Sequence, residues 1–264
     1  MKFLIFGDVV GKPGREAITR ALPDLRAEYE PDSVIVNIEN AAGGRGMSPS
    51  IMKEVEDWKA QVLTTGDHAW DTEASVEVLN NSKWPVIRPA NYPEGVQGKG
   101  YHVFTNGAWR VAVINLQGQV FFKNDPLNPF LYLDELLKKK DIATANIRLV
   151  DFHVEASSEA RGMSWHGDGR VSAIWGTHTH VPTADAQIMP EGTGYVTSLG
   201  FNGNHYSIIG VDKEEPLKGF LTQTPVKFKM DSTGPLEVSA LFLEIDPVSG
   251  VTKNIANVRK ILVE

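Results

Sequence analysis

Five short polar clusters in this chain each follow an apolar run of β-strand length. In open α/β sheets, sites form outside the carboxyl ends of the strands. We therefore expect carboxylates, an amide and imidazoles from distant parts of the chain to meet along one sheet edge. Oxygen and imidazole ligands together suit first-row divalent metals, so the pattern predicts a dinuclear metal site. The clusters are Gly7-Asp8, Glu39-Asn40, Gly66-Asp67-His68, Asp151-Phe152-His153 and Gly176-Thr177-His178-Thr179-His180.

The first 80 residues alternate between strand patterns and helix patterns. The order β-α-β-α-β-α argues for parallel strands joined by crossover helices. The expected strands are residues 3–6, 33–38 and 61–65. The expected helices run from Pro13 to about residue 29 with a kink at Pro23, from Ser48-Pro49 to about residue 59, and over residues 71–80 with Asp71 as the cap.

The middle of the chain continues this pattern, and the last third departs from it. We expect a short strand and loop over residues 85–92, strands at 101–105, 110–116, 147–152 and 171–175, a helix at 130–140, and a short polar helix before residue 171. Beyond residue 183, strands are expected at 186–189, 195–198, 237–245 and 251–262, with little helix between them. These predict a second, mostly antiparallel sheet packed on the first. No repeat or long linker interrupts the chain, so residues 1–264 are expected to form a single domain.

Composition narrows the functional classes. The chain has no cysteine, which excludes disulfides, thiolate zinc sites and a cysteine nucleophile. Its 33 acidic and 26 basic residues leave a net charge of −7, which disfavours broad binding to nucleic acid. A small phosphate ester can still bind where metal ions supply positive charge locally. The apolar start is too short for a signal peptide and no run reaches the length of a membrane span, so we expect a cytoplasmic protein without membrane contact.

Each cluster has an ordinary interpretation when it is considered alone. Asp8 is then a cap for the following helix, Glu39 marks a strand that reaches the surface, and His68 is a surface histidine. His178 and His180 are two apart, and on an extended segment they would project to one face about 6.5 Å apart. Thr177 would then point the other way and support a ligand. Four of the seven histidines lie at or just beyond strand ends beside three carboxylates, and this coincidence favours the metal site.

In their order along the chain, these residues resemble those of the calcineurin-like metallophosphoesterases, and more specifically of their bacterial YmdB-like branch. The resemblance extends over essentially the whole chain. The stretches that carry it are Gly7-Asp8-Val9-Val10-Gly11-Lys12-Pro13-Gly14-Arg15, Asn37-Ile38-Glu39-Asn40-Ala41-Ala42-Gly43-Gly44, Arg88-Pro89-Ala90-Asn91-Tyr92-Pro93, Asp151-Phe152-His153-Val154-Glu155-Ala156 and Gly176-Thr177-His178-Thr179-His180.

The resemblance implies an α/β fold, a four-layer αββα sandwich of two mixed sheets flanked by helices, with a dinuclear metal site. It implies that one ion is held by Asp8, Asn40 and His180, the other by Asp67, His153 and His178, with Glu39 bridging them, and that His68 lies next to the reacting phosphate. The family hydrolyses phosphodiesters, and 2′,3′-cyclic nucleotides are the substrate class of this branch. Fe or Mn are the favoured ions, with Mg or Zn as alternatives.

The expected activity is therefore that of a metal-dependent phosphodiesterase. A metal-bridging hydroxide would attack phosphorus, and His68 would assist the leaving oxygen. The partner is a small phosphodiester; RNA is an alternative that the charge does not support, and a homo-oligomer remains compatible with the sequence. A phosphomonoesterase, a nuclease, or a metal-bound regulatory protein with little turnover are the rival functions.

Two positions depart from the family pattern. Asp67 stands where the family usually has Asn, and Ser198 stands where this branch has an acidic residue. The additional carboxylate at Asp67 should strengthen metal binding and weaken Lewis acidity at the second ion. The change at Ser198 has no explanation in the sequence.

Overall fold

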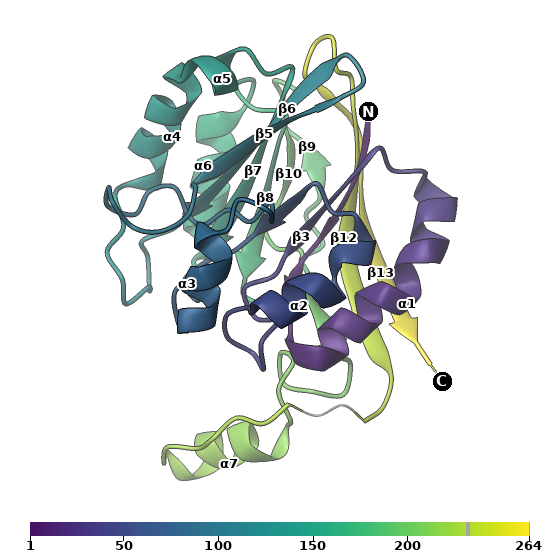
Figure 1. Ribbon diagram of the computed structural model, residues 1–264, viewed down its shortest axis with the longest axis vertical. Helices are drawn as coiled ribbons and strands as arrows, with labels where there is room; N and C mark the ends of the chain where they lie inside the picture. Colours follow the sequence, from purple (N-terminus) through teal and green to yellow (C-terminus); the bar gives the residue numbers. More distant parts are fainter. Residues whose placement is uncertain (231–232, 264) are drawn as a thin grey trace.

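The computed structural model describes residues 1–230 and 233–263 and contains two mixed β-sheets packed face to face, with helices covering their outer faces (Figure 1). The first sheet has the order β2-β11-β12-β1-β3-β4, with β13 paired to β12. Its strands are β1 (Lys2–Phe6), β2 (Asp8–Val9), β3 (Ser33–Asn37), β4 (Val62–Thr64), β11 (Phe201–Asn204), β12 (Leu236–Ile245) and β13 (Thr252–Leu262).

The second sheet has the order β5-β6-β7-β8-β10-β9. Its strands are β5 (Tyr101–Asn106), β6 (Trp109–Gln117), β7 (Ile147–Val154), β8 (Ala173–His178), β9 (Gln187–Ile188) and β10 (Gly194–Val196). The first sheet is covered by α1 (Gly11–Tyr29), α2 (Pro49–Glu54) and α3 (Glu73–Asn80), and the second by α4 (Pro129–Lys138), α5 (Lys140–Ala143) and α6 (Ser157–Gly167). A short 3₁₀ turn, Glu56–Trp58, follows α2. The arrangement confirms the four-layer αββα fold class.

The side-chain period of a strand explains why both faces of these sheets are apolar. In β1, Phe3 and Ile5 join the core between the two sheets, whereas Leu4 and Phe6 pack under the helices. The core between the sheets takes residues from both, including Val113 of β6. Strands buried on both faces appear as continuous apolar runs, which is the pattern that identified β1 and β3 in the sequence.

The expectation that the C-terminal strands form the second sheet was wrong for β12 and β13, whereas β9 and β10 do join that sheet. β12 and β13 form an antiparallel pair that joins the first sheet, where β12 pairs with β1. The second sheet is also not mostly antiparallel, because β6, β7, β8 and β10 pair in parallel. An apolar strand pattern shows that a strand is buried but not which sheet it joins, because that choice depends on long-range pairing.

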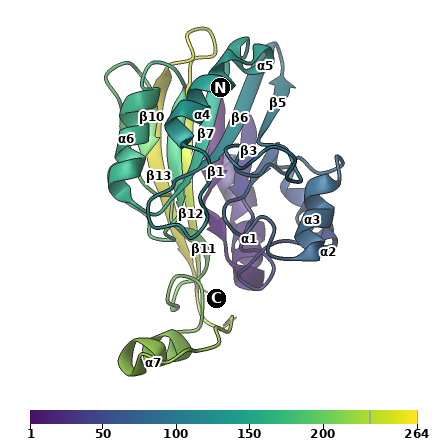
Figure 2. The same cartoon turned by 90° about the vertical axis from the view of Figure 1, so that its left-hand side faces the viewer.

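Three smaller elements were also missed. β2 and β11 are short strands that pair in parallel, and they show no local periodicity. Helix α7 (Glu214–Thr222) lies on an arm that projects from the body of the molecule (Figures 1 and 2). The predicted helix at the N-terminus runs through Pro23 as one element. Among the described residues, none of the helices has the length and apolar character needed to cross a bilayer.

Parallel pairing places the carboxyl ends of the central strands side by side. β1, β3 and β4 run parallel in the first sheet, and β6, β7 and β8 run parallel in the second. Residues that end or follow these strands therefore meet where the two sheets adjoin. This is the edge that the polar clusters were predicted to share.

Replacing Gly176 by Ala should destabilise the fold. A Cβ at this position in β8 would lie 1.8 Å from the Thr197 carbonyl oxygen, so the backbone would have to move. We expect a loss of about 1–3 kcal/mol or more in the free energy of unfolding, measured by urea titration.

Gly162→Ala is the matched control, because a Cβ there in α6 would make only an ordinary contact, 3.4 Å from Phe130 Cζ. We expect it to be neutral or to stabilise the protein by about 0.5–1 kcal/mol. Equal stability of Gly176→Ala and the unchanged protein would contradict the close approach of these two segments.

Candidate metal centre

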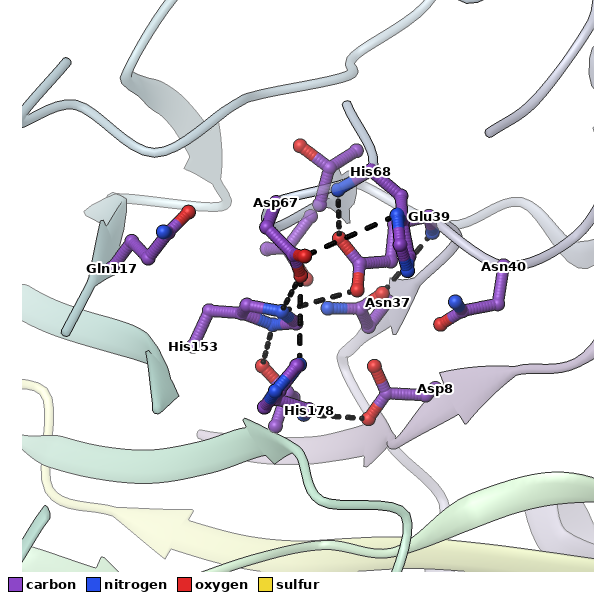
Figure 3. A network of polar contacts seen from close by, with 12 residues as sticks. Asp8, Asn37, Glu39, Asn40, Asp67, His68, Gln117, His153 and His178 are labelled. Atoms are coloured by element: carbon purple, nitrogen blue, oxygen red, sulfur yellow. Dashed lines mark hydrogen bonds and ion pairs between the residues drawn. The ribbon is translucent and has the colours of Figure 1, made fainter. Parts of the chain in front are cut away.

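Seven polar side chains from both sheets converge at the shared edge, and all of them except His180 are labelled in Figure 3. Asp8, Glu39 and Asp67 follow the ends of β1, β3 and β4 in the first sheet. His153 lies near the end of β7, and His178 ends β8 in the second sheet. The remaining two, Asn40 and His180, follow Glu39 and His178 in the chain. All seven are the residues that the sequence nominated as metal ligands.

One group comprises Glu39, Asp67, His153 and His178. Each offers one ligand atom, and these four atoms lie within 4.8 Å of one another. His153 Nε2 is 3.1 Å from Glu39 Oε1 and 3.0 Å from Asp67 Oδ1. His178 Nδ1 is 3.5 Å from the same Asp67 oxygen. Such spacing allows all four to contact a single cation.

Asp8, Asn40 and His180 form a second group beside the first. His180 Nε2 is 3.9 Å from Asp8 Oδ1, and the backbone N–H of His178 donates to Asp8 Oδ2 at 3.1 Å. Asp8 Oδ1 and Asn40 Oδ1 are buried and have no hydrogen-bond partner among the described residues. Buried polar atoms are rarely left without a partner, so both oxygens fit the coordination of a cation.

Asp8 does not cap the helix that follows it. Helix α1 has Val10 at its N-cap, without a side-chain hydrogen bond, whereas Asp8 lies buried in β2. The ordinary interpretation of this residue is therefore excluded, and its carboxylate faces the site.

The hydrogen bonds of the histidines direct their remaining ring nitrogens at carboxylates. Thr177 Oγ1 donates to Asp151 Oδ1 at 2.7 Å and lies 3.0 Å from His153 Nδ1, so it accepts the Nδ1 proton and leaves Nε2 facing Glu39 and Asp67. The carbonyl of Ile209 accepts from His180 Nδ1 at 2.8 Å in the same way.

His178 completes this pattern with the opposite nitrogen. Its Nε2 lies 3.2 Å from Glu155 Oε2, which leaves Nδ1 facing Asp67. In all three histidines an imidazole lone pair is thus aimed at the lone pairs of an acid. That arrangement is repulsive unless a cation, either a proton or a metal ion, lies between the two groups.

The pKa values of these residues reflect the close contacts between imidazoles and carboxylates. Burial opposes the charged form of His153, but the Glu39 and Asp67 carboxylates outweigh it and raise the pKa of His153 well above its ordinary value. Burial also opposes ionised Asp67, yet hydrogen bonds from His153 and His178 hold its pKa far below the usual range. Burial raises the pKa of Asp8, although His180 and His153 act against it. The acids and imidazoles therefore stabilise positive charge in their midst.

A second layer of residues fixes the orientation of His153. Asp151 is fully buried, and it accepts hydrogen bonds from Thr177 and, across the two sheets, from Thr64 Oγ1. Desolvation raises the pKa of Asp151 to about 7, although both hydroxyls act against the shift. The prediction that Thr177 supports a ligand agrees with this geometry.

The segment that carries His178 and His180 is not the extended strand that was expected. β8 ends at His178, and the two residues have positive φ values of 98° and 59°. Left-handed backbone in residues other than glycine is uncommon and is found at functional sites. Because of these turns, one imidazole faces Asp67 and the other faces Asp8, instead of both projecting to one face.

Ser198 has a structural role behind this segment. Its Oγ accepts a hydrogen bond from Thr179 Oγ1 at 2.9 Å and from the Gly200 backbone N–H at 3.2 Å. Thr179 lies between His178 and His180. Ser198 thus helps to hold the turn between the two imidazoles, which a single-sequence pattern does not reveal.

His68 lies at the edge of the centre. Its backbone N–H donates to Glu39 Oε2 at 3.3 Å, and its ring Nδ1 lies 2.8 Å from Asp71 Oδ2. The prediction that Asp71 caps the following helix was wrong, because the N-cap is Thr72, whose hydroxyl accepts from the Ser75 N–H at 3.1 Å. Asp71 instead orients the His68 ring. The spacing of three residues between His68 and Asp71 was the sequence feature that could have indicated this contact.

The chain matches a known family over nearly its whole length. A family model described as "YmdB-like protein" matches residues 4–258. A Bacillus subtilis protein named 2′,3′-cyclic-nucleotide 2′-phosphodiesterase is 41% identical over 265 residues, which is 100% of this chain and 97% of that relative.

Two solved structures resemble the fold to a similar extent. A hypothetical protein from Thermus thermophilus has a TM-score of 0.91 and 36% identity, covering 99% of this chain and 100% of the other. A structure described as a novel phosphatase from Mycoplasma pneumoniae has a TM-score of 0.92 and 31% identity, covering 100% and 94%.

Replacing Thr177 by Val should weaken metal binding. Val keeps the shape of the side chain but removes the hydroxyl that holds His153 Nδ1 and Asp151. Loss of such a supporting partner costs about 10–100-fold in metal affinity. The measurement is metal content after dialysis against graded chelator concentrations.

Thr144→Val is the matched control, because the exposed Thr144 hydroxyl donates a hydrogen bond to the Lys140 carbonyl of α5, away from the centre. It should leave metal affinity unchanged. Full metal affinity in Thr177→Val would show that the hydroxyl does not orient the ligand.

Proposed function

Because this chain belongs to the YmdB-like family of metallophosphoesterases, we propose that it hydrolyses small phosphodiesters, with 2′,3′-cyclic nucleotides as the substrate class. The observation that carries the proposal is the convergence of three imidazoles and three carboxylates in which each free ring nitrogen faces an acid. The name of the Bacillus subtilis relative supports the choice of substrate.

We assign the ligands of two divalent ions on the spacing of the side chains. Asp8, Asn40 and His180 would hold one ion, Asp67, His153 and His178 would hold the other, and Glu39 would serve both with its two oxygens. The unpartnered oxygens of Asp8 and Asn40 support the first set. The 4.8 Å cluster supports the second. Fe or Mn are the preferred ions, with Mg or Zn as alternatives, because mixed oxygen and imidazole sites accept all four.

The chemistry supplied by two such ions is charge neutralisation at phosphate oxygens and a bound water that ionises near neutral pH. The chain's own contribution to the reaction is proton transfer and orientation. Hydrolysis of the 2′ P–O bond adds a water oxygen to phosphorus and releases the ribose 2′ oxygen, which must gain a proton. His68 would donate that proton, and the hydrogen bond between its ring and Asp71 supports this role. Glu39 fixes the His68 backbone through its second oxygen.

A substrate panel tests the proposal against its rivals. Metal-loaded protein should hydrolyse 2′,3′-cyclic AMP to the 3′-monophosphate and also cleave bis-p-nitrophenyl phosphate. Preference for p-nitrophenyl phosphate would instead favour a phosphomonoesterase, which is the second candidate because the similar Mycoplasma pneumoniae structure is described as a phosphatase. Absence of turnover on every substrate with two metals bound would favour a regulatory protein.

Replacing His68 by Ala should lower kcat by about 10²–10⁴-fold, the usual contribution of general acid catalysis. Metal content should remain near that of the unchanged protein, because His68 lies outside both proposed ligand sets. Steady-state kinetics and elemental analysis of the same sample are the measurements. Parallel loss of metal and activity would contradict the assigned role.

Replacing Glu39 by Gln should remove metal and activity together. The side chain is 1% exposed, and the substitution takes away a charge shared by both proposed ions. Asp67→Asn is the matched comparison, since it neutralises a carboxylate proposed to bind one ion only. We expect Asp67→Asn to lower metal affinity less than Glu39→Gln while keeping or raising kcat at saturating metal. A greater metal loss in Asp67→Asn would contradict the bridging role of Glu39.

A further inference from the structure

A loop with two adjacent phenylalanines borders the metal centre. Residues 118–128 connect β6 to α4, and Phe122 lies near the middle of this loop. The centroid of the Phe122 ring is 4.7 Å from that of His178 and 5.9 Å from that of His153. The loop therefore contacts the imidazole side of the centre directly.

Side chains from outside the loop hold both of its ends. The Glu159 carboxylate, near the start of α6, accepts the backbone N–H groups of Gln119 at 2.9 Å and Val120 at 3.1 Å. At the other end, the Asn91 side chain donates to the Leu127 carbonyl at 2.7 Å. Hydrogen bonds to a charged carboxylate are stronger than neutral ones, so the loop has a defined shape.

Phe121, which precedes Phe122 in this loop, is unusual in two respects. Its φ is 69°, a left-handed conformation that glycine adopts without strain and bulky residues rarely adopt. Its side chain is 83% exposed, so the ring gains almost nothing from burial in the protein. Strained residues of this kind are found at ligand clamps. Contact between the ring and a ligand would explain both the strained backbone and the exposed apolar side chain.

A further aromatic pair ties the loop to the other side of the centre. The Tyr92 hydroxyl donates to Gln117 Oε1 and accepts from Asn124 Nδ2 of the loop, both at 3.0 Å. The Tyr92 ring packs on Trp70 with centroids 4.5 Å apart, and Trp70 is two residues beyond His68. The loop that carries Phe121 is thus connected to the His68 segment as well as to His178.

We propose that Phe121 is a specificity-determining residue whose ring stacks on the nucleobase of the substrate. The inference rests on the proposed function, because a cyclic phosphate held at the metal centre must direct its base away from the ions. Phe121 adjoins Phe122, whose ring already touches His178, and consecutive Cα atoms are only about 3.8 Å apart. Every base presents an aromatic face, so stacking would select nucleotides without choosing among bases.

The test compares Phe121→Ala and Phe121→Trp on a substrate with a base and one without. On 2′,3′-cyclic AMP, Phe121→Ala should raise KM by about 5- to 100-fold and leave kcat within about twofold, the pattern of lost uniform binding. On glycerol 1,2-cyclic phosphate, its kcat/KM should not change. Phe121→Trp should restore the KM for the nucleotide. Phe220→Ala is the matched control, since this residue is also a phenylalanine, 73% exposed, on the distant helix α7.

Two kinetic results would overturn the inference. Equal losses on both substrates would mean that Phe121 supports the centre itself. Unchanged KM on both would mean that the exposed ring serves another surface, such as contact with a second copy of the chain.

A binding measurement separates this inference from the proposed function. If the metal-loaded protein turns over neither substrate, the proposed function fails, and equilibrium dialysis with adenosine 3′-phosphate and glycerol phosphate then decides the role of Phe121. Selective loss of adenosine 3′-phosphate binding in Phe121→Ala would support base stacking, and equal binding by both proteins would refute it.

Discussion

The candidate metal centre requires positive charge, because its carboxylates and imidazole nitrogens point at one another. Backbone and side-chain acceptors take one nitrogen of His153, His178 and His180, and the second nitrogen of each then meets a carboxylate. These groups are largely buried. Contacts between like charges or between lone pairs cost more free energy in the protein interior than in water. A proton shared with His153 relieves part of this repulsion. Metal ions bound among these groups would relieve it throughout, and so the donor set is the main physical argument for a metal centre.

Close packing between the sheets is what brings these donors together. A Cβ on Gly66 would lie 2.2 Å from His153 Nε2, so only glycine lets the imidazole of the second sheet reach Asp67 of the first. Gly66 therefore provides space for a proposed ligand from a strand of the other sheet. A local backbone argument cannot anticipate that contact, because it depends on how two sheets meet.

The parts of the fold that could be predicted are those that depend on local sequence patterns. Continuous apolar runs identified β1 and β3, and the polar residues after them follow from the rule that parallel strands end at one edge. The allocation of β12 to the first sheet could not be predicted, because its buried residues fit either layer equally well. In the site, the candidate ligands could be identified from the sequence, since histidines that follow strands are chemically distinctive. Their supporting partners, Glu155 and Ile209, were not, because an exposed acid and a backbone carbonyl carry no signal.

In the turns at His178 and His180, hydrogen bonds stabilise a strained backbone. His178 and His180 both adopt left-handed backbone conformations, which without support would be abandoned for an extended segment. The backbone N–H of His178 is held by Asp8, and the residue between the two histidines is held by Ser198. The His180 ring is held by the carbonyl of Ile209, itself at a positive φ of 48° in the segment that leads to the α7 arm. This hydrogen bond therefore connects a proposed metal ligand to the segment that leads to the α7 arm, and the position of the His180 ring depends on that segment.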